Sequence, residues 1–236
     1  MANIMRVIDF ETTGLEPPEA QVIEVGWCDF DRENMTFLDG GSYFCGAETN
    51  PPESRAIHHI WPEDVAGKKP FDASEMNDAA IKEGAICYVA YNATHEEKFL
   101  GVLPSGLPLV CAYKAGLRIW PDAPSHSNFG LLYWLLDQGK VVPDRSKLAQ
   151  SHRAFPDAYA TALILKALYE SGVTGKQLVQ WTAEPRLLPT CPIGAWRGSK
   201  WADVDEGFLN WILSKSDMDY DIAWNAGREL DRRYEQ

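Results

Sequence analysis

The chain has 236 residues, 45% of them hydrophobic and 24% charged, so it can bury a sizeable core and is neither disordered nor of low complexity. It contains no apolar run of about 18 residues and no charged N-terminal segment followed by a long apolar one, so we expect neither a membrane span nor a secretory signal. The five cysteines are widely spaced and form no CxxC pair, which argues against a disulfide framework or a thiolate zinc site. The expected location is a reducing cytoplasm.

The net charge of −12 ordinarily counts against a partner rich in phosphate, because an acidic surface repels polyanions. The acidic residues are unevenly distributed, however. Residues 1–104 hold 7 Lys or Arg against 19 Asp or Glu, whereas residues 105–172 hold 7 against 5. Carboxylates that bind a divalent cation are partly neutralised in use. The total charge therefore does not exclude a nucleic-acid substrate.

Strands are predicted first along the chain, and helices follow. The apolar, β-branched run at residues 5–10 ends at a Thr-Gly turn and indicates a buried strand. Two further strands are predicted at residues 21–30 and 34–44, and the residues between them suit a hairpin, which gives the sheet an antiparallel start. The remaining predicted elements are helices at 61–66 and 72–83, a strand at 85–90, a helix at 96–100, a strand at 107–111, and helices at 112–120, 128–136 and 155–169.

This order predicts an α/β domain of three layers with a mixed sheet. Pro51 and Pro52 predict a loop. The composition changes after Gly172, because five of the nine Trp residues fall in the last 64 residues, where a strand is predicted at 193–196. We therefore predict a main domain over residues 1–172 and a small Trp-rich module over residues 173–236.

The first predicted strand ends in two acidic residues, Asp9 and Glu11. Side chains two residues apart on a strand point to the same face, so the two carboxylates repel each other. A divalent cation removes that repulsion, and Mg²⁺ prefers oxygen ligands. A polar sheet edge produces the same pattern, so the pair alone does not decide between the two.

Two further segments carry titratable side chains at helix starts. His152 and Asp157 both lie near the N-terminus of the helix at 155–169, and Glu96 follows the strand at 85–90. Each segment has an ordinary alternative explanation. An acidic residue stabilises a helix N-terminus through the helix dipole, and a histidine is common on a surface loop.

Taken together, the three segments resemble the DEDDh subgroup of the DnaQ-like 3′–5′ exonuclease superfamily, which includes enzymes of the RNase T and oligoribonuclease type. The resemblance covers residues 5–171 and is carried by IDFETTGL at 8–15, YNATHEEKFL at 91–100 and HRAFPDAYAT at 152–161. AIHHI at 56–60, LRIWP, HSNFGLL and the trailing IGAWRGSKWADV are similar to the exonuclease X branch of that superfamily. This chain has Glu96 where the family usually has Asp.

The resemblance implies an RNase H-like fold with a mixed five-stranded sheet flanked by helices, plus a small C-terminal module. It implies two Mg²⁺ ions per site, with Mn²⁺ as a substitute, held by Asp9, Glu11, Glu96 and Asp157. It also implies that His152 is the general base. Substrate contacts are expected from Thr12, Thr13, Gly14, Leu15, His58 and Asn92, the last two of which could instead pack behind the site. Glu24 is expected to be a structural polar residue of the sheet.

The expected function is a magnesium-dependent 3′–5′ exonuclease that releases nucleoside monophosphates from DNA 3′ ends, single-stranded ends above all, in repair or nucleic-acid turnover. An exoribonuclease is the first alternative, because the sequence contains no clear reader of the 2′-hydroxyl. The second is a nucleic-acid-binding module with weakened catalysis, for which the reasons are Glu96 and the acidic surface.

The expected partner is DNA, and RNA is left open; no membrane partner is expected. The C-terminal module could recruit a repair complex, and a homodimer is also left open. Trp196 and Trp201, near Arg197 and Lys200, are the candidates for stacking on a single strand, although core packing is the favoured explanation for both. The other three Trp residues of the module are assigned to packing.

Overall fold

A mixed sheet of five strands forms the centre of the molecule, in the order β3-β2-β1-β4-β5. The computed structural model describes residues 3–101 and 106–235. The strands are β1 (Ile4–Thr12), β2 (Val22–Asp31), β3 (Thr36–Phe44), β4 (Ala85–Ala90) and β5 (Leu109–Cys111). The pairs β1–β2 and β2–β3 are antiparallel, whereas β1–β4 and β4–β5 are parallel. The predicted mixed five-stranded sheet is therefore confirmed.

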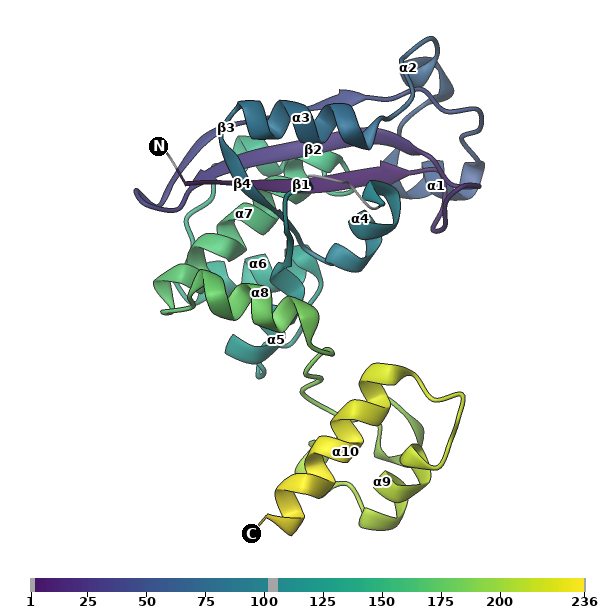
Figure 1. The fold of residues 1–236 in the computed structure, drawn as a ribbon, viewed down its shortest axis with the longest axis vertical. Coiled ribbons are helices and arrows are strands. Elements are labelled where there is room, and N and C mark those ends of the chain that lie inside the picture. Colours follow the sequence, from purple (N-terminus) through teal and green to yellow (C-terminus); the bar gives the residue numbers. More distant parts are fainter. Residues whose placement is uncertain (1–2, 102–105, 236) are drawn as a thin grey trace.

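Helices cover both faces of this sheet (Figure 1). The α-helices are α1 (Pro52–His58), α2 (Pro62–Val65), α3 (Ala73–Lys82), α4 (Ala93–Leu100), α5 (Ala112–Ile119), α6 (Asn128–Asp137), α7 (Ala154–Glu170), α8 (Gly175–Ala183), α9 (Glu206–Leu213) and α10 (Tyr220–Tyr234). Three short 3₁₀ turns are η1 (Arg145–Leu148), η2 (Gly194–Trp196) and η3 (Trp201–Asp203). Within the described ranges, no helix combines the length and apolarity needed to cross a bilayer.

Helix α7 packs directly on β1 and β2 and fixes one face of the sheet. Met5 and Val7 of β1 share a core with the buried inner side of α7, which includes Ala158 and Ala162. The first turn of α7 lies so close to β2 that a Cβ at Gly26 would stand 2.1 Å from the carbonyl carbon of Ala154. A glycine is therefore required at this point of β2, and it sets where the helix begins relative to the strand ends.

The other face of the sheet is covered by α3, whose Met76 and Ala80 pack on Ile8 and Val25. Asp72 caps this helix by accepting hydrogen bonds from the backbone N–H groups of Ser74 and Glu75.

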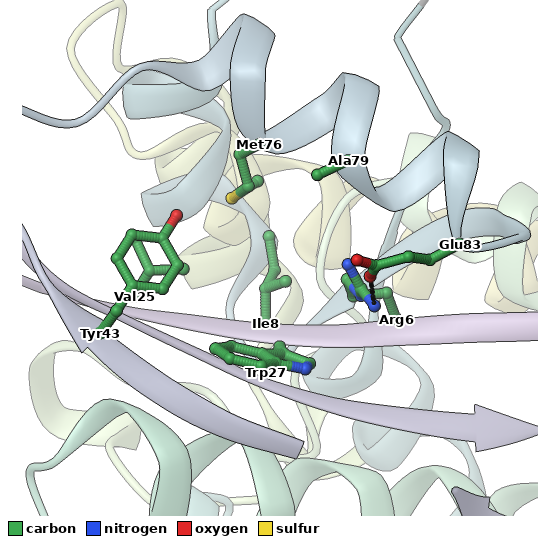
Figure 2. Close-up of a pocket in the computed structure, with 8 residues that line it drawn as sticks. All are labelled: Arg6, Ile8, Val25, Trp27, Tyr43, Met76, Ala79 and Glu83. Carbon is green, nitrogen blue, oxygen red and sulfur yellow. Dashed lines mark hydrogen bonds and ion pairs between the residues drawn. The ribbon is translucent and has the colours of Figure 1, made fainter. Parts of the chain in front are cut away.

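Figure 2 shows a pocket of about 140 Å³ between α3 and the sheet. Arg6 lies at its end and bonds to Asp29 on β2 and to Glu83 beyond α3. The pocket is otherwise apolar apart from the edges of Trp27 and Tyr43, so it offers little chemistry of its own.

Two predictions about local structure are wrong. The segment at 193–196 is the 3₁₀ turn η2 and not a strand, because Gly194 has a φ of +61° and its carbonyl accepts a bond from the Arg197 N–H. The predicted loop at Pro51 and Pro52 instead opens α1. Pro52 is the first residue of that helix, where its missing N–H costs nothing.

The C-terminal residues form a separate core. Helix α8 packs on β5 and α5, and its Leu178 is buried in the main core. The residues after α8 have a core of their own, which includes Cys191, Trp201, Val204, Leu209, Ile212 and Leu230. Figure 1 shows α9 and α10 set apart from the sheet domain, at the end of an extended segment. Helix α8 therefore packs as part of the sheet domain, although it follows the predicted boundary near residue 173.

Candidate active site

Three acidic side chains from distant parts of the chain meet at one end of the sheet. Asp9 and Glu11 come from the end of β1, and Asp157 comes from the first turn of α7. One oxygen of each carboxylate lies within 4.8 Å of the others. We call these three residues the acid cluster. Period-two alternation in β1 and the docking of α7 on β2 bring them together.

Glu96 approaches the cluster from α4. It lies in the first turn of that helix and is only 4% exposed. Its Oε2 atom is buried and has no hydrogen-bond partner among the described residues. A buried carboxylate oxygen without a donor is costly unless a cation or water pairs with it. The cluster and this unpaired oxygen together fit a divalent metal site with oxygen ligands.

The carboxyl groups of the site have raised pKa values, because burial penalises their charged forms and neighbouring carboxylates repel one another. The pKa of Asp9 is raised well above its usual value by burial and then by the charges of Asp157 and Glu11. Burial is also the main cause for Glu11 and Glu96, whose pKa values rise to about 8, and for Asp157, whose pKa rises to about 7. Without a cation, the site therefore holds protons near neutral pH.

His152 lies on the turn just before α7, with an exposed side chain. Its backbone has a φ of +58°, and its N–H donates to Oδ1 of Asp157 over 3.2 Å. The candidate base and one member of the acid cluster are thus tied through the main chain. The next residue, Arg153, bonds to Glu24, which is 1% exposed and is indeed a structural polar residue of the sheet.

A pocket of about 450 Å³ opens beside Glu11. It is lined in part by the turn after β1, which contributes Thr12, Thr13, Gly14 and Leu15. Ser54 on α1 donates from its Oγ to the carbonyl of Thr13 and so fastens α1 to this turn. The sequence analysis missed α1, which supplies much of the opposite wall. The signal available was Pro52 itself, since proline is common in the first turn of a helix.

Two candidate substrate residues are placed differently. His58 of α1 lines the pocket and is 1% exposed. Asn92 is exposed, occupies the N-cap position of α4 without a capping hydrogen bond from its side chain, and is not among the lining residues. Nδ1 of His58 accepts the N–H of Ile60 over 2.9 Å, and its Nε2 is buried without a partner among the described residues. Burial lowers the pKa of His58. The neutral ring therefore carries its proton on Nε2, as a donor in need of an acceptor.

The structure contradicts the assignment of Trp201 as a stacking candidate. Its side chain is 8% exposed in the core of the C-terminal module, and its Nε1–H donates to the carbonyl of Leu188 over 2.8 Å. Trp196 is partly buried against the same core. The favoured explanation for both residues, packing in a small module, is therefore confirmed.

Each of the other three Trp residues, which were assigned to packing, has a cationic side chain beside its ring. Trp211 on α9 is 44% exposed, and the Nζ of Lys215 stands 5.1 Å from its ring centre. The two residues are four apart in the sequence, a spacing that brings side chains together in a helix. Arg118 and Arg228 likewise lie over the rings of Trp181 and Trp224.

Known proteins are similar to this chain in both sequence and fold. Residues 7–101 match the exonuclease family of RNase T. Exodeoxyribonuclease 10 of Escherichia coli (strain K12) is 28% identical over 219 residues, which span 91% of this chain and 92% of that protein.

A solved structure of exonuclease X in complex with 5′ overhanging duplex DNA aligns with a TM-score of 0.61 and 27% identity, over 76% of this chain and 99% of that one. Escherichia coli exonuclease I in complex with a dA16 oligonucleotide aligns with a TM-score of 0.53 and 13% identity, over 76% of this chain and 42% of that one, a likeness of fold alone.

These matches agree with the geometry of the acid cluster at the end of an RNase H-like sheet. The chain is similar to the DnaQ-like exonucleases, and to exonuclease X among them, and is a hydrolytic exonuclease.

The raised carboxyl pKa values predict how metal-free stability changes with pH. In the unfolded chain these carboxyl groups lose their protons near pH 4, whereas Glu11, Glu96 and Asp157 in the folded protein retain theirs up to about pH 7 to 8. The folded state therefore binds more protons between these values, and the free energy of unfolding falls as the pH rises. We expect the Tm in EDTA to fall from pH 5.5 to pH 8.5, and Mg²⁺ to restore most of the loss.

The measurement is differential scanning fluorimetry of the full chain at both pH values, with EDTA or with Mg²⁺. The control is a variant with Asp9→Asn and Glu11→Gln, in which the fall should be smaller and the gain from Mg²⁺ absent. If the Tm falls equally in both proteins between pH 5.5 and pH 8.5, the assignment of the acid cluster as the metal site would be contradicted.

Proposed function

We propose that this exonuclease removes nucleoside monophosphates one at a time from the 3′ ends of DNA, with a preference for single-stranded ends, in repair or nucleic-acid turnover. The observation that carries the proposal is the meeting of Asp9, Glu11 and Asp157 within 4.8 Å, next to the turn that bears His152. An acid cluster beside a candidate base, with a pocket at its side, has the parts needed for metal-assisted hydrolysis.

The acid cluster and Glu96 would hold two divalent cations, Mg²⁺ or, in its place, Mn²⁺. The close carboxylates and the unpaired Oε2 of Glu96 support this set of ligands. When bound, such ions supply an acidified water molecule and stabilise negative charge on the leaving oxygen.

His152 would accept the proton of the attacking water. The water oxygen would form a new bond to phosphorus as the bond from phosphorus to the 3′-oxygen of the preceding nucleotide breaks. A nucleoside 5′-monophosphate would leave, and the 3′-oxygen of the shortened strand would take up a proton from solvent to become a hydroxyl. The exposed imidazole is free to reach the water, and the bond from its backbone N–H to Asp157 keeps it beside the cluster. A histidine suits this task because it exchanges protons near neutral pH.

The pocket beside Glu11 would receive the terminal nucleotide. Its volume of about 450 Å³ lies within the range of ligand pockets, roughly 300–1,000 Å³. Thr12 and Gly14 would offer backbone groups, whereas the N–H and carbonyl of Thr13 are already bonded to Gln21 and Ser54, so Thr13 would act by shaping the turn. Leu15, which is 74% exposed, would offer an apolar contact for the base. The buried Nε2–H of His58 would donate to an oxygen of the nucleotide. Asn92 would contact the substrate only at the edge of the site.

DNA is the proposed substrate because of the relatives of this chain. The Escherichia coli relative is named an exodeoxyribonuclease, and the aligned exonuclease X structure holds duplex DNA. An exoribonuclease would use the same chemistry, so the substrate test includes both polymers.

We expect 5′-labelled single-stranded DNA to be shortened to a ladder on a denaturing gel in Mg²⁺, faster than RNA of the same sequence. EDTA should abolish the ladder. Asp157→Ala should lower the rate by at least about 100-fold, because it removes one ligand of the acid cluster. Faster shortening of RNA would reassign the substrate, and a ladder that persists in EDTA would contradict the metal-dependent mechanism.

Glu96→Asp tests whether the site is built around the longer side chain. The carboxylate of Glu96 is buried, with Oε2 unpaired, and shortening the side chain withdraws this oxygen from the cluster. We expect kcat to fall by about 10- to 100-fold, since a displacement of about 1 Å can cost that much.

The matched control is Glu97→Asp, the same change at the exposed neighbouring position of α4, which should leave kcat unaltered. A gain in kcat for Glu96→Asp would favour the alternative of a binding module with weakened catalysis. A loss of kcat in Glu97→Asp alone would indicate that Glu97, and not Glu96, is the metal ligand.

A further inference from the structure

The carboxylate of Glu24 on β2 is the most completely bonded acidic group near the site. Its two oxygens accept bonds from Nε and Nη2 of Arg153, both at 2.9 Å, from the backbone N–H of Ala154 at 3.2 Å, and from Oγ of Ser42 at 2.7 Å. Glu24 is 1% exposed and lies opposite Glu11 on the neighbouring strand, as its partner in the β1–β2 ladder. The pairing with Arg153 is bidentate, which fixes both distance and orientation.

The segment held in this way follows an unusual turn. His152 has a φ of +58°, a left-handed conformation that is uncommon for residues other than glycine. On one side of the turn, the N–H of His152 is tied to Asp157. On the other side, the side chain of Arg153 and the N–H of Ala154 are tied to Glu24.

Close packing completes the arrangement. Two residues after Glu24, Gly26 lets the backbone of Ala154 approach the strand, as described above for the start of α7. The guanidinium carbon of Arg153 also lies 5.3 Å from the ring centre of Phe44 on β3. The segment from His152 to Ala154 is therefore held on β2 and β3 by the ion pair, the backbone hydrogen bond and close packing.

We propose that Glu24 is a positioning residue, whose ion pair with Arg153 fixes the turn at His152 and so sets where the imidazole stands relative to the acid cluster. The inference rests on the proposed role of His152 as the base. It also explains why a fifth carboxylate is present beside a cluster that already repels negative charge. A glutamine has a single acceptor oxygen where Glu24 has two, so it keeps the bonds made to only one of them, and it lacks the charge for a bidentate pair with the guanidinium.

The test is a double-mutant cycle on kcat in the full chain, with single-stranded DNA and Mg²⁺. We expect Glu24→Gln to lower kcat by about 10- to 100-fold while KM changes by less than about 3-fold, because the base is displaced and the nucleotide pocket is not. In a His152→Ala background, Glu24→Gln should lower kcat no further, since residues that act through one another are not additive.

The matched control is Asp29→Asn. Asp29 is another buried acid of β2 that forms a bidentate pair with an arginine, Arg6, which lies on the opposite face of the sheet from α7, at the end of the pocket in Figure 2. This variant should lose stability in urea but keep kcat within about 2-fold. If Glu24→Gln does not fold, Arg153→Lys takes its place, because it keeps the charge and loses only the fork of two bonds.

Three results would overturn the proposal: an unchanged kcat in Glu24→Gln, an equal loss in Asp29→Asn, or a loss of the same size with and without His152. Measuring kcat of His152→Ala alone distinguishes a failure of this proposal from a failure of the proposed function. An unchanged kcat in His152→Ala alone would remove His152 as the base, and the role of Glu24 with it.

Discussion

Buried and half-buried carboxylates repel one another at one end of the sheet, and the packing of the surrounding elements holds them there. Asp9, Glu11 and Asp157 are held within 4.8 Å, and Glu96 is buried nearby with an unpaired oxygen. Bringing such charges together costs free energy unless protons or cations neutralise them. The surrounding fold opposes this cost. Helix α7 is fixed against β2 at Gly26, and its long apolar side is buried in the main core, so Asp157 cannot move away from β1.

The sequence predicts well the features that depend on a short stretch of chain. The same-face placement of Asp9 and Glu11 follows from the two-residue period of a strand. The strands β1, β2 and β3 and helix α7 follow from local patterns of apolar residues and turns, and α7 begins only one residue before the predicted start. The prediction that the three acidic segments meet came from the resemblance to a family, because no local pattern indicates which distant segments lie side by side.

The features that could not be predicted depend on tertiary contacts. Arg153 and Glu24 are 129 positions apart, so nothing near either residue reveals their ion pair. Trp201 and Trp211 look alike in the sequence, yet one is in the core of the C-terminal module and the other is half exposed. The orientation of His58, with its ring proton on Nε2, follows from one hydrogen bond to Ile60. Composition marked the change after Gly172, whereas packing keeps α8 with the sheet.

Proton release on cation binding would show whether the carboxyl groups of the site hold the metal. Isothermal titration calorimetry of Mg²⁺ into the full chain at pH 7, in two buffers of different ionisation enthalpy, counts the protons released. The carboxyl groups of Glu11 and Glu96, with pKa values raised to about 8, hold protons that bound cations must displace. We predict the release of about one proton or more per chain. Binding with no proton released, or no binding at all, would contradict the account.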